Sequence, residues 1–197
     1  MGRRGALSPR EYPPLGPRVV VGGISGCGKT TLAKELARRL GAPHVELDAH
    51  FHQPGWTQAT DEQFTASVSA ATAGDTWVAD GNYGRVRHIV WGRATTVVFL
   101  DYPKGLPTWR TVKRSIPRLV RGTELWNGNR ERWRNLLDSG HPIWWSWHHH
   151  GVNRAGYEAG FADPAYAHLD VIRLRTPAET RRWLERNQTL PPEVIQA

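Results

Sequence analysis

The chain has 197 residues, 39% of them hydrophobic, which suits one domain built around one core. With 26 Lys and Arg against 18 Asp and Glu, its net charge of +8 at pH 7 favours anions such as nucleotides, nucleic acid or acidic metabolites. The single cysteine, Cys27, excludes an internal disulfide bond and a multi-cysteine zinc site. No apolar run approaches the roughly 20 residues that cross a bilayer, so we expect a cytoplasmic protein without a membrane partner.

The strands are predicted from runs of β-branched and apolar residues. Prolines and glycines without hydrophobic periodicity in residues 1–17 predict a flexible leader before the domain. Residues 18–22 (RVVVG) are typical of a strand buried on both faces of a parallel sheet. Further strands are expected at residues 44–47, 77–79, 95–100 and 169–174.

The helices are predicted from their caps and apolar stripes. Residues 30–40 carry a leucine stripe and stop at Gly41, and a capping box begins a helix at Thr60 that should run to Gly74. Thr176 caps a last helix that reaches about residue 187, before a flexible tail at residues 188–197. Strands that alternate with helices predict one α/β domain at residues 18–187, with a mostly parallel sheet flanked by helices.

Residues 115–167 do not fit this alternation. The segment is rich in arginine and tryptophan, and we interpret it as a mobile helical lid inserted into the domain. Arg110, Arg114 and Arg118 recur every four residues and would share one face of a helix. We expect Arg114 and Arg118 to neutralise charge on the phosphate being transferred, while a solvated helix face is the alternative.

Residues 23–30 (GISGCGKT) match the phosphate-binding pattern G-x-x-x-x-G-K-[ST]. Its glycines let backbone N–H groups surround the β-phosphate of ATP, and the following helix directs its positive end to the same place. Lys29 would reach the β and γ oxygens, and the Thr30 hydroxyl would ligate Mg²⁺. The predicted nucleotide-binding residues are Gly23, Ser25, Gly26, Cys27, Gly28, Lys29, Thr30 and Thr31.

Two aspartates follow predicted strands. Asp80 closes the strand at residues 77–79, and we expect it to hold Mg²⁺ together with Thr30, with a turn before Gly81 as the alternative. Asp48 ends the second strand, at the sheet edge where ligands of open parallel sheets bind. We expect Asp48 to act as a general base on a hydroxyl acceptor; a water-mediated Mg²⁺ contact and a local cap are the other interpretations.

With these residues in place, the chain resembles the adenylate-kinase-related small P-loop kinases, and within them proteins labelled DNA-topology-modulation proteins. The likeness covers about residues 19–186 and is carried by GGISGCGKTT, LDAHFHQPGW, WVADGNY, VVFLDYP and ELWNGNRE. It implies a P-loop NTPase fold with five parallel strands, an acceptor site after strands two and three, and a lid. An aspartate after the second strand also resembles shikimate and gluconate kinases, although their second aspartate is replaced by His50.

The preferred function is therefore an ATP- and Mg²⁺-dependent phosphotransferase that acts on a small molecule or nucleotide, more readily on a hydroxyl than on a phosphate. A nucleotide-binding switch or weak ATPase that binds nucleic acid through its basic insertion is the alternative. A kinase that acts on a nucleotide sugar is a third interpretation. The sequence does not identify the acceptor or the oligomeric state.

Overall fold

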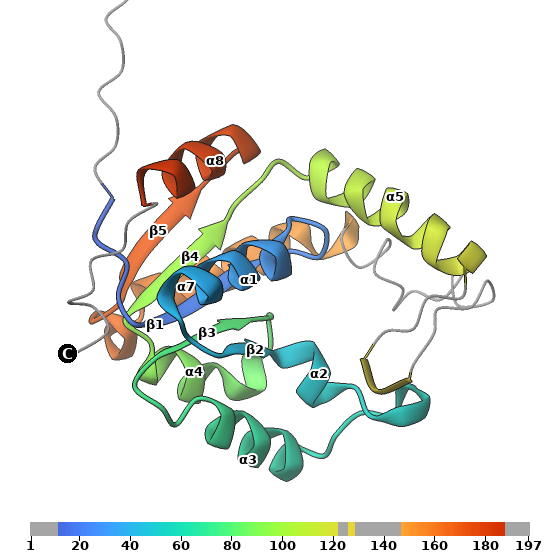
Figure 1. The fold of residues 1–197 in the computed structure, drawn as a ribbon, viewed down its shortest axis with the longest axis horizontal. Helices are drawn as coiled ribbons and strands as arrows, with labels where there is room; N and C mark the ends of the chain where they lie inside the picture. The colour runs from blue at the N-terminus through green and yellow to red at the C-terminus, as the bar shows by residue number, and fades with distance from the viewer. Residues whose placement is uncertain (1–11, 122–125, 129–146, 188–197) are drawn as a thin grey trace, which may run out of the picture.

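The computed structural model describes residues 12–121, 126–128 and 147–187 of the chain. Five strands form one sheet in the order β2-β3-β1-β4-β5, and every neighbouring pair is parallel. Helices cover both faces (Figure 1). The predicted α/β architecture with a five-stranded parallel sheet is confirmed, and it is the P-loop NTPase fold.

The strands lie close to where the sequence predicts them. They are β1 (Arg18–Gly23), β2 (His44–Glu46), β3 (Trp77–Asp80), β4 (Thr96–Leu100) and β5 (Asp170–Leu174). β3 and β4 are buried along their whole length, which is why, apart from Asp80 at the end of β3, they consist of apolar and β-branched residues rather than an alternating pattern. Because all strands are parallel, their carboxyl ends share one edge of the sheet. The P-loop (residues 23–30), Asp80 and the start of α2 (Leu47–Phe51) come together at this edge.

Seven helices are described: α1 (Lys29–Leu40), α2 (Leu47–Phe51), α3 (Asp61–Ala71), α4 (Arg87–Arg93), α5 (Gly105–Arg121), α7 (His150–Ala162) and α8 (Pro177–Arg186). The capping box at Thr60 is present, with both reciprocal bonds to Gln63. α3 ends earlier than predicted, since Thr72 leaves helical geometry and bonds back to the Val68 carbonyl. Among the described residues, none of the helices is long and apolar enough to span a membrane.

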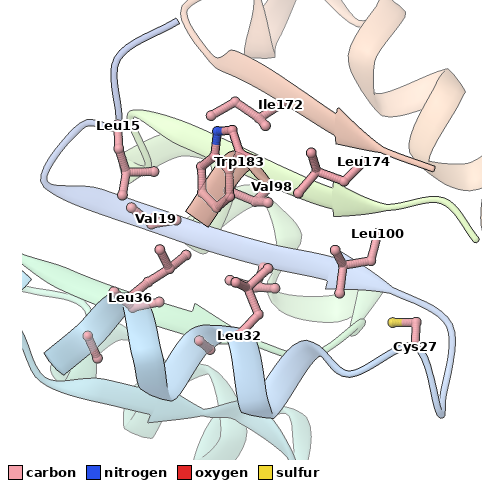
Figure 2. Packing of buried hydrophobic residues seen from close by; sticks show 14 of the residues in the cluster. Leu15, Val19, Cys27, Leu32, Leu36, Val98, Leu100, Ile172, Leu174 and Trp183 are labelled. Carbon is pink, nitrogen blue, oxygen red and sulfur yellow. The ribbon is translucent and has the colours of Figure 1, made fainter. Parts of the chain in front are cut away.

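One face of the sheet packs against α1 and α8. Val19, Val98 and Ile172 from the strands meet Leu36 of α1 and Trp183 of α8, as Figure 2 shows. Leu15 joins this cluster and is 2% exposed, and the Tyr12 hydroxyl donates to Glu179 of α8. The last part of the predicted leader is therefore packed against the domain, because Leu15 fills the space beside α8.

The opposite face packs against α3, α4 and α7. Tyr157 of α7 is 1% exposed and stacks on Phe99 of β4, with ring centroids 4.4 Å apart, and Trp91 of α4 stacks on Phe161. The sequence prediction placed α7 within a mobile lid at residues 115–167, and this is wrong for residues 150–162. Their aromatic side chains complete the core. Most of the remaining predicted lid lies outside the described residues.

Candidate active site

The P-loop connects β1 to α1 and depends on glycine at three positions. Gly23, Gly26 and Gly28 have φ values of 142°, 84° and 100°, which side chains other than hydrogen rarely allow. At Gly26 a Cβ atom would also lie 2.1 Å from the Pro107 carbonyl of α5. Glycine thus serves both loop geometry and the close approach of α5 to the loop.

Lys29 and Thr30 occupy the places in the loop that the motif predicts. The Lys29 ammonium donates to the Ile24 carbonyl at 3.2 Å, so its side chain folds back across the loop. Ser25 and Gly28 are half-buried in the loop, and Thr31 is exposed at the start of α1. The loop therefore presents N–H groups and a cation at the N-terminal end of a twelve-residue helix, which is a setting for phosphate oxygens.

Only the backbone of Cys27 forms part of the loop. Its side chain is buried in the α1-side core (Figure 2), and burial raises the pKa of the thiol. A raised pKa keeps the thiol protonated and weakly nucleophilic. Cys27 thus contributes its backbone to the loop, and its side chain packs.

Asp80 is the most deeply buried charge of the site, with 2% of its surface exposed. One of its oxygens accepts a hydrogen bond from the Thr30 hydroxyl at 2.7 Å, and the other lies 2.7 Å from His44 Nε2. These contacts compensate a carboxylate that would otherwise be costly to bury. Thr30 and Asp80, predicted together as Mg²⁺ ligands, are thus adjacent.

The residues present fit Mg²⁺ in chemistry and number. A hydroxyl and a carboxylate are hard oxygen ligands, and Mg²⁺ commonly takes one or two protein groups and completes its shell with water and phosphate oxygens. Within the described residues there is no cluster of three or more His, Cys, Asp or Glu side chains suited to a metal. Such a sparse donor set favours Mg²⁺ that arrives with a nucleotide over a permanently held ion.

Asp48 does not end a strand, as the sequence prediction had it. β2 stops at Glu46, and Asp48 lies in the first turn of the short helix α2. The chain turns there because the buried side chain of Leu47 packs against Gly81, where a Cβ atom would come within 2.7 Å of it. Asp48 nevertheless remains at the carboxyl edge of the sheet, two residues beyond β2.

Tyr83 fixes the orientation of Asp48. Its hydroxyl donates to Asp48 Oδ1 at 2.6 Å. Burial, followed by the charge of Asp48, raises the pKa of Tyr83, so this hydroxyl remains a proton donor. The Tyr83 ring packs against Phe51 and Phe64, with centroids 4.8 and 5.1 Å away, and these two rings also contact each other. Asp48 is therefore a half-buried carboxylate in one defined orientation.

The side chain of His50 contacts α3. Its Nδ1 lies 2.6 Å from the Ser67 hydroxyl of α3, and burial lowers the pKa of its ring. The residue thus ties α2 to α3.

A cavity of about 850 Å³ opens beside the P-loop, between α1, α8 and the end of β4. Its lining includes Gly28, Leu100, Tyr102, Arg110, Pro177 and Thr180. The Arg110 guanidinium donates to the Cys27 carbonyl at 3.3 Å and lies 5.8 Å from the centre of the Tyr102 ring. A partly apolar cavity of this volume next to the P-loop has the size and chemistry to take a nucleobase and ribose.

The two lid arginines are placed only in part. Arg114 and Arg118 lie on α5, as predicted, one and two turns beyond Arg110. Their side chains fall outside the described part of the chain, so their contact with a phosphate stays a prediction. α5 itself does approach the P-loop, through Arg110 and through the packing of Pro107 on Gly26.

The sequence analysis did not identify the contacts that three residues make in this site. They are His44, Tyr83 and Tyr157. His44 reaches Asp80 because β2 and β3 pair in the register His44 to Val78. Tyr157 accepts a hydrogen bond from the N–H of Gly23, the first P-loop residue, across 134 positions. Neither contact leaves a local sequence signal. Tyr83 does have one, since it ends the DGNY stretch, but its partner depends on where α2 turns.

The comparisons with known proteins agree with the fold. A sequence profile of the ATPase family associated with various cellular activities matches residues 19–101, which run from β1 through β4. A search of curated proteins found no match. The likeness to DNA-topology-modulation proteins finds no support in these comparisons.

Solved structures with similar folds cover most of the chain. The shikimate kinase of Acinetobacter baumannii, solved with shikimate, is 19% identical, covers 87% of this chain and 91% of its own, and has a TM-score of 0.51. A sugar kinase from Janibacter is 25% identical over 94% and 100% of the two chains, with a TM-score of 0.49. The shikimate kinase of Bacteroides thetaiotaomicron is 16% identical over 87% and 98%, with a TM-score of 0.47. The first of these likenesses supports the fold, and at this identity it establishes no more than the fold.

Proposed function

We propose that the chain is a kinase that transfers the γ-phosphoryl group of ATP to a hydroxyl group of a small molecule. The observation that best supports this proposal is a pair of carboxylates at one edge of the sheet. Asp80 at the end of β3 is buried and bonded to Thr30 of the P-loop, and Asp48 in α2 is bonded to the Tyr83 hydroxyl. The two carboxylates have different surroundings, which suits two different tasks.

The nucleotide end of the proposal rests on the P-loop and the cavity beside it. The loop supplies N–H groups, Lys29 supplies a cation, and the cavity lined by Tyr102 and Pro177 has room for a base and ribose. Lys29 would shift from the Ile24 carbonyl to the phosphate oxygens when ATP binds, since an anion is the stronger acceptor. Thr30 and Asp80 would hold Mg²⁺, which when bound neutralises charge on the β- and γ-phosphates.

The acceptor end rests on Asp48. In the proposed step the acceptor O–H gives its proton to Asp48, and the acceptor oxygen forms a bond to the γ-phosphorus while the bond from phosphorus to the β-phosphate oxygen breaks. ADP and a phosphate ester leave, and the proton passes to solvent. A phosphate acceptor would need cations in place of a base. The oriented carboxylate of Asp48 therefore favours an alcohol.

One solved structure that shares the fold, with a TM-score of 0.51, is the Acinetobacter baumannii shikimate kinase in complex with shikimate. The likeness is compatible with the proposal and leaves the acceptor open. The competing function, a switch that binds nucleic acid, depends on arginines between residues 115 and 167, half of which lie outside the described residues. No contact among the described residues favours it.

The test is a metabolite-library screen with γ-labelled ATP and Mg²⁺, in which the compound that gains label is identified. Lys29→Ala is the matched control, because it removes the proposed phosphate-binding cation from a half-buried position at the start of α1 without emptying a core position. We expect label to appear on an alcohol with the wild-type chain and not with the variant. Label that appears only as inorganic phosphate, at equal rates with and without the library, would refute the kinase proposal.

A further inference from the structure

Helix α2, which carries Asp48, is too short to hold itself in place. It has five residues, and an isolated helix of this length has no stability in water. The carbonyl groups at its C-terminal end lack partners within the helix, as at every helix end. The position of Asp48 therefore depends on what contacts α2 from outside.

One such contact comes from Asn127, which is 75 residues beyond His52, the C-cap residue of the helix. Its side-chain amide donates to the carbonyl of Ala49 at 3.1 Å and to that of His52 at 2.5 Å. These carbonyls belong to the last turn of α2 and to its C-cap residue. Asn127 thus acts as a C-terminal cap that is supplied by a distant segment.

The backbone of Asn127 suits this task. The residue lies at the centre of η3 (Trp126–Gly128), with φ 55° and ψ 38°, in the left-handed region. Asparagine tolerates this conformation better than other residues that have a side chain, apart from aspartate. Aspartate would offer oxygens, and no N–H, to the two carbonyls. Conformation and donor together therefore select asparagine at this position.

The segment that carries Asn127 follows α5, and α5 packs on the P-loop. Pro107 and Thr111 of α5 fill the space in front of Gly26, and Arg110 bonds to the Cys27 carbonyl. In Figure 1, α5 leads away from the P-loop side and η3 lies beside α2. α5 thus contacts the P-loop, and η3, which follows it in the chain, contacts the helix that carries Asp48.

We propose that Asn127 is a positioning residue, which holds the helix of Asp48 in place and links it to the helix that packs on the P-loop. The functional part of this inference rests on the proposed role of Asp48 as the base. The structural part does not, because the contacts of Asn127 exist whatever Asp48 does.

The size of the effect follows from the exposure of the contact. Asn127 is exposed, so its two hydrogen bonds replace bonds to water and contribute to the local stability of α2 rather than to the stability of the whole domain. The N–H of His52 bonds to the Asp48 carbonyl within α2 and reports directly on opening of this helix.

The experiment is hydrogen exchange on the full chain, read at the His52 amide. Asn127→Asp keeps size and backbone preference while removing the donor. We expect His52 exchange to be about threefold to tenfold faster in this variant, the range that one net hydrogen bond supports. Thr57→Val is the matched control, because it removes a nearby hydrogen bond to Pro54 without touching α2, and it should leave His52 exchange unchanged.

A second reading tests the link to the P-loop. Adding Mg²⁺ with the β,γ-imido analogue of ATP should slow His52 exchange in the wild type and in Thr57→Val, and should not slow it in Asn127→Asp. Calorimetry should give the same affinity for the analogue in all three. A purely structural cap would speed exchange without changing the response to the analogue.

The proposal is overturned if Asn127→Asp exchanges at the wild-type rate at His52, if exchange rises equally across β3 and β4, or if the analogue protects the variant as well as the wild type. None of these readings requires turnover. A failure of the kinase proposal would appear in the labelling screen and would leave the His52 exchange rates without the analogue unaffected, so the two failures are distinguishable.

Discussion

Replacing Tyr157 with phenylalanine tests whether the hydrogen bond between α7 and the first residue of the P-loop stabilises the loop. The substitution keeps the aromatic ring that stacks on Phe99 and contacts Trp91, and it removes the hydroxyl that accepts the Gly23 N–H at 3.2 Å. Burial raises the pKa of Tyr157, so this hydroxyl stays protonated and the interaction is a neutral hydrogen bond.

The magnitude follows from what the variant leaves behind. Gly23 is buried, so its N–H would have no water to replace the lost acceptor, and an unsatisfied buried donor costs about 1–3 kcal/mol. For a chain of this size, each kcal/mol lowers Tm by about 2–4 °C, which predicts a loss of about 2–12 °C. Because Gly23 is the first residue of the P-loop, affinity for ATP should also fall.

Thermal unfolding followed by circular dichroism measures the first effect, and calorimetry with ATP and Mg²⁺ measures the second. Tyr166→Phe is the matched control, since Tyr166 packs edge-on against Trp91 and its hydroxyl makes no hydrogen bond within the described residues. A Tm for Tyr157→Phe within about 1 °C of both the wild type and the control would refute the reasoning.

Three further predictions follow from single contacts. His44→Leu removes the donor to Asp80 and should weaken the Mg²⁺-dependent part of ATP binding in calorimetry, whereas His44→Gln retains a donor and should keep most of it; equal loss in both would contradict the bond. Hydrogen bonds from Arg38 and, to a smaller extent, from Arg39 lower the pKa of Glu35 to about 2. The ionised form of Glu35 therefore stabilises the fold above about pH 4.5, and this contribution is lost as the pH falls toward 2. The difference in Tm between Glu35→Gln and the wild type should shrink as the pH falls through this window, and a difference that stays constant would contradict the prediction. Arg110→Ala should weaken ATP binding by about threefold to tenfold in fluorescence titration, since it removes one wall of the cavity beside the P-loop; unchanged affinity would exclude Arg110 from the nucleotide site.

The elements that the sequence predicts well are those fixed by short-range patterns. β1, β3 and β4 are continuous apolar runs because both of their faces are covered, and the P-loop follows from glycines at fixed spacing. The pairing of Thr30 with Asp80 was predictable for the same reason. In a parallel sheet the end of β3 lies beside the end of β1, which leads into the loop.

The errors arise where distant segments decide the local structure. α7 contains glycines and exposed residues and shows little apolar periodicity, yet Tyr157 and Phe161 complete the core because they pack against Trp91 of α4. Leu47, the first residue of α2, packs against Gly81, which directly follows β3 and is 34 residues away in the sequence. Three residues of β2 are too few for a pattern to mark its end.

The central claim is that Asp48 takes a proton from a hydroxyl acceptor, and the most direct test is the turnover of Asp48→Asn on the compound that the labelling screen identifies. Asparagine retains size and can still accept the Tyr83 hydrogen bond through its carbonyl oxygen, so orientation is preserved while the base is lost. We predict a fall in kcat of about 10² or more, with ATP affinity unchanged in calorimetry. Full turnover by Asp48→Asn would contradict the claim.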